Sequence, residues 1–465
     1  MLSNIISSID AFLWGWPLII LLSATHIFMT IRTGFIQKDT FKAIKMSIQK
    51  DPDAEGDVSQ FKALALGLAA TIGTGNIIGV GTAIALGGPG VVFWMWLTGI
   101  FGIATMYAET LVAIKYRVKS ENGTMIGGAM YVLERGLNAR WAGIIFASLA
   151  ALCAIGTGCM VQANAFAVNL HTNYSVPPLL VAVVLSVLAA LVIIGGIKSI
   201  ANVASKLVPF MGLFYISGCL IILVVNADVL GQAVAVICQS AFTARSATGG
   251  FVGSTIALAC RYGFARGLFS NESGMGSAPL AAAAAQTRNP KRQAMVAMTA
   301  TFWDTVVICL LSGLVFVSCI IKYPEIDGLS GNGALLTSQA FGMIPYIGVP
   351  VLMVGLMTFT FSTILGWYYY GERSAVYLLG EKSILIYKII WIAGVFIGSL
   401  VELNFVWNLC DLMNGLMAIP NIIAVLLLHK VIASETKKYS GEHIMDKDQS
   451  EIPILENSHK GVLVL

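Results

Sequence analysis

Apolar residues run in long stretches along this chain, and short polar segments separate them. A bilayer core about 30 Å thick needs about 20 apolar residues per spanning helix. Eleven stretches meet this requirement, so the pattern predicts an all-α polytopic membrane protein with about 11 transmembrane helices. The stretches cover residues 10–31, 61–86, 89–114, 142–170, 178–197, 206–226, 250–286, 293–321, 346–370, 384–402 and 405–429.

Two of these stretches are interrupted by small polar residues. The first interruption, residues 73–76, reads Gly-Thr-Gly-Asn, and the second, residues 270–274, reads Ser-Asn-Glu-Ser-Gly. Glycine costs about 1 kcal/mol in a helix interior, so neither run favours a continuous helix. Inside a bilayer, non-helical backbone persists only where protein surrounds it or where it lines a cavity. The sequence therefore predicts two broken helices, which in matching positions of two halves indicate the binding site of a secondary transporter.

The loops alternate between many and few basic residues. Segment 32–62 carries six Lys or Arg residues, the turn at 87–88 carries none, and segment 115–140 carries five. The alternation continues to the tail, which carries Lys430, Lys437 and Lys438. Because basic loops stay in the cytoplasm, we expect an extracellular N-terminus, a cytoplasmic C-terminus and a location in the cell membrane.

The ten stretches after the first divide into two sets of five. Each set opens with a broken helix, and an odd number of spans per set forces the second set to be inverted. We therefore expect one extra N-terminal helix followed by a 5+5 inverted repeat, with a site at the midplane. The predicted segments are 1–60 (N-terminal helix and cytoplasmic loop), 61–226 (first repeat), 227–249 (extracellular connector), 250–430 (second repeat) and 431–465 (cytoplasmic tail).

Composition narrows the class of function. Charged residues make up only 11% of the chain, against about 25% in soluble domains. The formal net charge of +4 is dispersed, so no nucleic-acid-binding face is predicted. The histidines show neither metal-ligand spacing nor a nucleophile–base arrangement, which argues against an enzyme and a cofactor. A channel would need rings of charge or carbonyl groups from repeated subunits, and no obligate protein partner is predicted.

The two breaks suit a zwitterionic amino acid. Half-helix ends expose N–H and C=O groups with about half a unit of charge, so they can hold a carboxylate and an ammonium group. Thr74 and Asn76 add polar side chains to the first break. Close helix packing is the alternative, since Gly75 and Gly79, like Gly263 and Gly267, have the spacing of helix-association motifs. The presence of both breaks together favours a binding site.

Hydroxyl groups in the ninth stretch suggest a sodium site, because sodium prefers hard oxygen ligands. Thr358, Thr360, Ser362 and Thr363 lie in this stretch, and Thr363 is the favoured ligand. The alternative is that these hydroxyls bond their own helix backbone.

Ionisable and amide groups inside the predicted spans are candidate functional residues of the site. Each has a structural alternative, such as pairing with Arg, capping a helix or joining two helices. They are Glu109, Gln162, Glu272 (with Arg266 as a possible partner), Asp304, Glu402 and Asp411.

Four motifs carry a resemblance to a known family: residues 73–79 (GTGNIIG), 87–96 (GGPGVVFWMW), 266–277 (RGLFSNESGMGS) and 362–369 (STILGWYY). With these motifs the chain resembles the alanine or glycine:cation symporter family (sodium:alanine symporters) of the amino acid–polyamine–organocation superfamily. The likeness runs from about residue 10 to 430. It implies a leucine-transporter-type fold and uptake of small neutral amino acids, alanine or glycine first, coupled to sodium or protons. A larger neutral substrate such as glutamine stays open.

The resemblance also implies which residues form the site. The substrate would meet residues of both breaks together with one residue of the fourth stretch and two of the ninth. Sodium would lie between the first broken helix and the ninth stretch. The implied substrate residues are Thr74, Gly75, Asn76, Gln162, Phe269, Ser270, Asn271, Gly274, Thr363 and Trp367, and the implied sodium ligands are Thr71, Thr74, Thr360, Ser362 and Thr363.

Overall fold

The computed structural model describes residues 2–49, 54–120, 123–243, 255–326, 332–401, 404–439 and 452–454. Almost all regular structure in these ranges is helical, apart from one short hairpin of β1 (Val118–Lys119) and β2 (Met125–Ile126). The helices of the first half are α1 (Leu2–Leu13), α2 (Trp16–Arg32), η1 (Ile36–Asp39), α3 (Thr40–Ser47), α4 (Gln60–Thr71), η2 (Thr74–Asn76), α5 (Ile78–Gly87), α6 (Val91–Lys115), α7 (Ala129–Tyr131), η3 (Val132–Gly136), α8 (Arg140–Cys153), η4 (Ala154–Met160), α9 (Val161–Tyr174), α10 (Pro178–Ile194), α11 (Gly196–Val225) and α12 (Ala227–Phe242). Those of the second half are α13 (Ile256–Asn271), α14 (Ala278–Ala282), α15 (Pro290–Thr301), η5 (Phe302–Cys309), α16 (Leu310–Lys322), α17 (Gly333–Gly342), α18 (Gly348–Leu379), α19 (Ser383–Gly398), α20 (Asn404–Leu427) and α21 (His429–Lys438).

Among the described residues, seven helices are long and apolar enough to span a membrane. Two shorter apolar helices, α10 and α19, coincide with two further predicted stretches. The remaining two stretches are the broken helices, α4 with α5 and α13 with α14. These elements account for the predicted set of about 11 transmembrane helices, which confirms the expected fold class.

Both broken helices begin with a side-chain cap. The Ser59 hydroxyl accepts a hydrogen bond from the Lys62 N–H (3.4 Å) at the start of α4, and Thr255 accepts one from Leu258 N–H (3.2 Å) at the start of α13. Such caps satisfy one of the free N–H groups of a first helical turn. The local sequence therefore defines where each of these helices starts.

The helices stop where the sequence predicts. In the first broken helix, α4 ends at Thr71, Ile72 is extended, and α5 begins at Ile78. In the second, Glu272 adopts a left-handed conformation (φ 57°), followed by Gly274 (φ 92°) and Gly276 (φ 79°). Left-handed backbone ends a helix and suits glycine, which lacks the clashing Cβ.

The connector and the tail contain more structure than the sequence indicated. Residues 227–242 form α12, and the part of the predicted connector from 244 to 249 lies outside the described residues. In the tail, α21 runs to Lys438, and Lys119 N–H donates to Pro453 O (3.0 Å) beside β1. Glu402 also lies outside the described residues.

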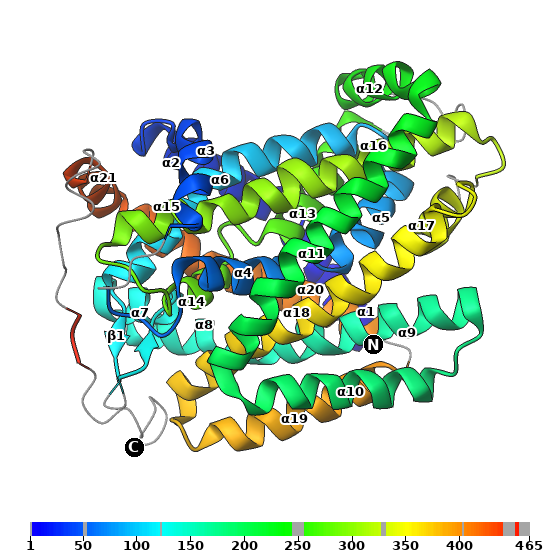
Figure 1. Cartoon of the computed structure of the whole chain (residues 1–465). Helices are drawn as coiled ribbons and strands as arrows, with labels where there is room; N and C mark the ends of the chain where they lie inside the picture. Colours follow the sequence, from blue (N-terminus) through cyan, green and yellow to red (C-terminus); the bar gives the residue numbers. More distant parts are fainter. Residues whose placement is uncertain are drawn as a thin grey trace.

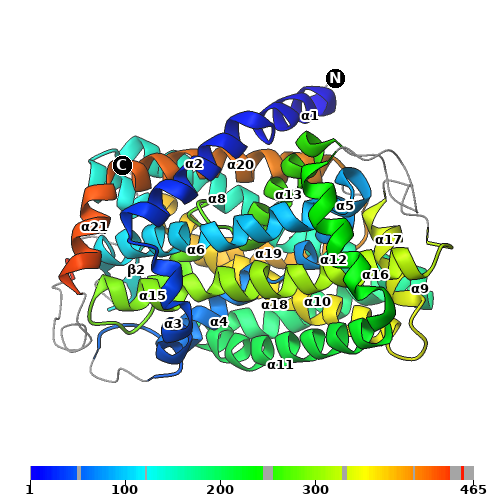
Figure 2. The same ribbon diagram turned by 90° about the horizontal axis from the view of Figure 1, so that it is seen from above.

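The helices form one bundle with two distinct ends. In Figure 1, α12 lies along one edge, α10 and α19 lie along the opposite edge, and α4, α13 and α18 lie between them. Figures 1 and 2 both show α21 and the β1–β2 hairpin at one end of the molecule, called the hairpin end below, and α17 at the other. Gly263 packs closely against α6, as the packing alternative expects, because a Cβ there would approach Trp94 Cβ to 2.6 Å.

Candidate substrate and cation site

A small cavity lies between the two breaks. Its volume of about 20 Å³ is close to the space of one water molecule. A bound amino acid therefore requires lining side chains to move from this arrangement. The lining residues are Ala70, Thr71, Gly73, Gly75, Thr157, Gln162, Phe269, Ser270, Glu272, Met275, Thr363, Trp367 and Asn414.

The first break is held against the fourth predicted stretch by Gln162. Its side-chain oxygen accepts a hydrogen bond from Thr74 N–H (3.2 Å), and its nitrogen donates to Thr157 O (3.3 Å) in the π-helical segment η4. Gly73 lies so close to α18 that a Cβ would come within 2.7 Å of Thr363 Oγ1. Gln162 thus orients the Thr74 N–H group of the first break. The predicted contact of Gln162 with a substrate carboxylate stays a prediction.

Asn76 turns away from the cavity. Its side-chain oxygen accepts from Gly73 N–H (2.8 Å), and its nitrogen donates to Asp304 Oδ1 (2.6 Å). Asn76 closes the loop of the break in this way and does not line the cavity. The structure therefore places this predicted substrate residue behind the site.

In the second break, Phe269 and Ser270 line the cavity, whereas Asn271 and Gly274 do not. The Asn271 side-chain oxygen accepts from Ser273 N–H (2.9 Å) and stabilises the turn locally. Gly274 N–H donates to Glu109 Oε2 (3.2 Å) on α6. Glu109 is thus a hydrogen-bond partner of the unwound backbone, a role that the sequence analysis did not predict.

Glu272 lies in the cavity wall and is buried. Its carboxylate accepts a hydrogen bond from Ser277 Oγ (2.5 Å), and Trp367 of α18 lines the same cavity. Arg266, the expected partner, instead forms an ion pair with Asp411 (3.7 Å). Glu272 therefore stabilises the second broken helix internally, through Ser277.

The predicted sodium ligands divide into two groups. Thr363 Oγ1 donates to Ile72 O (3.1 Å), and Thr71 lines the cavity, so both lie where the first break meets α18. Ser362 instead donates to Phe359 O of its own helix (2.8 Å), as the structural alternative predicts. The buried hydroxyl groups of Thr74 and Thr360 have no hydrogen-bond partner. A buried hydroxyl oxygen is a hard ligand of the kind that sodium prefers, so Thr74 and Thr360 stay candidate ligands.

Two polar residues that line the cavity, Thr157 and Asn414, were not among the predicted site residues. Thr157 and Asn414 form a hydrogen bond with each other (3.3 Å), which joins η4 to α20 at the cavity. Met275 also lines it, from the second break. A polar residue inside an apolar stretch is on its own a weak sign of a binding site. Nothing in the sequence predicts that Thr157 and Asn414 face the two breaks.

At the hairpin end, Arg117 joins the segments that flank the two broken helices. Its buried guanidinium donates to carbonyl oxygens of Ala283 (3.2 Å), Ala285 (2.8 Å), Thr287 (3.1 Å) and Glu55 (3.3 Å). These acceptors follow the second broken helix and precede the first. Burial lowers the pKa of Arg117 to about 10, with the nearby Glu55 carboxylate acting in the opposite direction. The side chain therefore stays charged at neutral pH.

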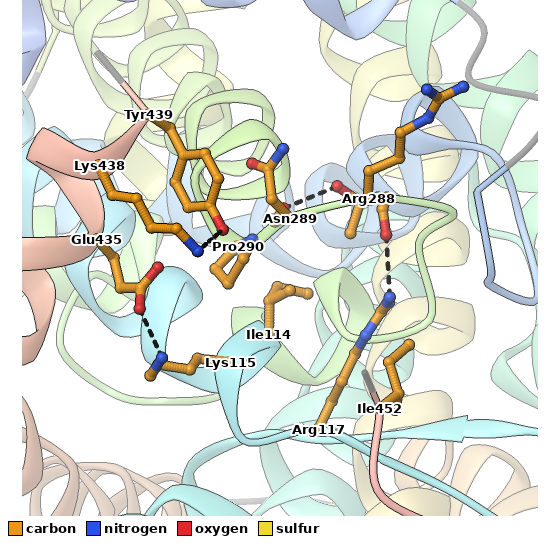
Figure 3. A pocket seen from close by; sticks show the side chains of 11 residues that line it. Ile114, Lys115, Arg117, Arg288, Asn289, Pro290, Glu435, Lys438, Tyr439 and Ile452 are labelled. Carbon is orange, nitrogen blue, oxygen red and sulfur yellow. Dashed lines mark hydrogen bonds and ion pairs between the residues drawn. The ribbon is translucent and has the colours of Figure 1, made fainter. Parts of the chain in front are cut away.

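A second, surface pocket lies beside Arg117 (Figure 3). Lys115 there pairs with Glu435 of α21 (2.5 Å), and Lys438 donates to the Tyr439 hydroxyl (3.0 Å). It includes no residue of either break, so it is separate from the cavity described above.

Comparison with known proteins agrees with this arrangement. A sequence model described as the sodium:alanine symporter family matches residues 1–452. The chain is 46% identical to the sodium/alanine symporter AgcS of Methanococcus maripaludis, over 94% of this chain and 97% of the relative. It is 33% identical to the probable sodium/glutamine symporter GlnT of Bacillus subtilis, over 99% and 96%. Among solved structures, MhsT in complex with L-phenylalanine is similar with a TM-score of 0.60 at 15% identity, over 84% of this chain and 95% of MhsT. That likeness supports the leucine-transporter-type fold.

Proposed function

Because the chain belongs to the sodium:alanine symporter family, we propose that it couples the uptake of alanine or glycine to inward movement of sodium. A sodium-coupled amino-acid symporter is a transporter and not an enzyme, and sodium is its coupling ion. The observation that carries the proposal is the cavity between the two breaks. It is lined by backbone of the first break at Gly73 and Gly75 and by Ser270 of the second.

The proposed binding mode uses the exposed backbone. The amino-acid carboxylate takes N–H groups of the first break, near Gly75, and the ammonium group takes carbonyl oxygens and the Ser270 hydroxyl. Phe269 and Trp367 limit the space for the side chain, which supports a small substrate. Sodium takes oxygens of Thr71 and Thr363, with Thr74 and Thr360 as further ligands. In this mode Asn76, Asn271 and Gly274 stabilise the backbone of the two breaks and do not contact the substrate.

We further propose transport by alternating access around this site, in which the broken helices move relative to the remaining helices. The arrangement of basic loops supports an N-terminus outside and a C-terminus in the cytoplasm. The hairpin end, which carries Arg117 and α21, is then cytoplasmic. The Arg117 contacts between the two broken helices support a closed cytoplasmic side in this mechanism.

Two alternatives have support of their own. Glutamine is the substrate named for a relative that is 33% identical. Proton coupling is the second, because the carboxylate of Glu272 lies in the cavity wall.

The test is uptake of radiolabelled alanine into proteoliposomes that contain the purified protein. An inward sodium gradient is compared with a matched choline gradient. We expect accumulation above equilibrium only with sodium. Accumulation driven equally by a proton gradient in choline contradicts sodium coupling, and accumulation of glutamine but not alanine contradicts the proposed substrate.

A further inference from the structure

Asp304 is a buried carboxylate that lies behind the cavity, outside its lining. It belongs to the π-helical segment η5, in the middle of the long helix formed by α15, η5 and α16. Its side chain is 0% exposed, and no Lys, Arg or His among the described residues forms an ion pair with it. Hydrogen bonds alone therefore compensate the burial of this polar group.

One of these bonds reaches the first break. Asp304 Oδ1 accepts from the Asn76 side-chain nitrogen (2.6 Å), and the Asn76 side-chain oxygen accepts from Gly73 N–H (2.8 Å). The amide of Asn76 thus relays a hydrogen bond from Gly73, which lines the cavity, to Asp304.

A second bond reaches the second break. Asp304 Oδ2 accepts from Ser270 Oγ (2.8 Å), and Ser270 lines the cavity from the last turn of α13. The third donor, Thr305 Oγ1 (2.6 Å), comes from the neighbouring residue and touches neither break. The Asp304 carboxylate therefore joins both breaks. Its Oδ1 binds Asn76 of the first break, and its Oδ2 binds Ser270 of the second.

We propose that Asp304 is a positioning residue that sets the spacing between the two breaks and hence the shape of the cavity. The inference deepens the proposed function and rests on it, since the spacing matters for transport only if substrate binds between the breaks. Charge-assisted hydrogen bonds in a water-excluded site are the strong ones. A carboxylate with an acceptor oxygen on each side is therefore suited to this role.

The isosteric change Asp304→Asn separates this role from simple packing. An amide replaces one of the two acceptor oxygens with an NH2 donor, so the Ser270 hydroxyl must change from donor to acceptor and both bridges lose the charge of the carboxylate. Losing a charged hydrogen bond corresponds to about a tenfold to hundredfold effect. We expect the alanine concentration for half-maximal uptake to rise by about that factor, while the maximal rate changes less.

The double variant N76D/D304N tests the bridge directly. The new carboxylate at position 76 can accept from Gly73 N–H and from the new amide at position 304, whose oxygen can still accept from Ser270. We expect the double variant to recover most of the loss, as coupled partners do in a double-mutant cycle. The matched control is Thr305→Val, which removes the third donor and leaves both bridges, and which we expect to behave as wild type.

Hydrogen exchange of the purified protein in detergent, without substrate, gives a readout that needs no transport. Asp304→Asn should raise amide exchange by about tenfold in residues 72–77 and 270–276, and N76D/D304N should restore it. Exchange at wild-type level in both breaks, or an equal rise in Thr305→Val, overturns the proposal. If Asp304→Asn does not fold, Ser270→Ala breaks only the second bridge and should raise exchange in 270–276; no rise there overturns the proposal. A wild-type protein that accumulates no alanine contradicts the proposed function and leaves the exchange test intact.

Discussion

At the scale of single residues, the site depends on side chains that face the breaks from other helices. Thr363 reaches the carbonyl of Ile72, whereas Ser362 beside it bonds its own helix. Neighbours on one helix point in different directions, so their chemistry differs although their residue types are similar.

Thr363→Ala should weaken sodium binding, because it removes a hydroxyl oxygen beside the first break. We expect the sodium concentration for half-maximal alanine uptake to rise about tenfold, which corresponds to about 1.4 kcal/mol. The control is Thr358→Ala, since the Thr358 hydroxyl bonds Val354 O of its own helix (2.7 Å). An unchanged sodium dependence in Thr363→Ala would remove this residue from the proposed ligands.

Gly73→Ala should disturb the site by steric contact alone. A Cβ at Gly73 would lie 2.7 Å from Thr363 Oγ1 and 3.3 Å from the Gln162 side-chain oxygen. Overpacking of this kind costs about 1–3 kcal/mol, so alanine uptake should fall by at least fivefold. Gly79→Ala is the matched control, because its nearest contact would be Thr74 O at 4.0 Å. Equal uptake in the two variants would contradict this account.

At the scale of elements, each break depends on partners outside its own helix. The first break forms hydrogen bonds with Gln162 and Asp304, and the second forms them with Glu109 and Asp304. Unwound backbone buried in protein must find such hydrogen bonds, because no water replaces them inside a bilayer. The conformation of the breaks is therefore a property of the assembled bundle.

The Arg117 contacts predict that the hairpin end loosens when this side chain is shortened. Arg117→Ala leaves several carbonyls without their donor, which costs about 1–3 kcal/mol. We expect a lower melting temperature in detergent and faster amide exchange in residues 283–287. Lys115→Ala is the control, because its pairing with Glu435 is partly exposed and contributes about 0–1 kcal/mol. Equal effects of the two changes would show that Arg117 has no special role in closing this end.

At the scale of the whole molecule, the two ends of the bundle carry different elements. The helix α21 and the β1–β2 hairpin, which Arg117 directly precedes, lie at one end, away from α17 (Figure 2). The positive-inside rule makes this end cytoplasmic in the proposed orientation.

The orientation predicts the location of the C-terminus. Green fluorescent protein fused to the C-terminus should fluoresce, and alkaline phosphatase fused there should stay inactive in bacterial cells. Both reporters should keep these states when α21 is left intact, since Lys430, Lys437 and Lys438 then stay in the fusion. An active phosphatase fusion would reverse the proposed orientation.

The number of spanning helices, the two interruptions and the family could all be predicted from the order of the amino acids. Hydropathy and the helix cost of glycine act locally, so residues 73–76 and 270–274 carry their own signal. Only the tertiary structure decided which side chains face the cavity. Asn76 and Asn271 fold back on the chain, while Thr157 and Asn414 turn toward it. The physical reason is that backbone turns in the breaks, including the left-handed Glu272, reorient each following residue, and distant partners such as Asp304 and Glu109 hold those turns in place.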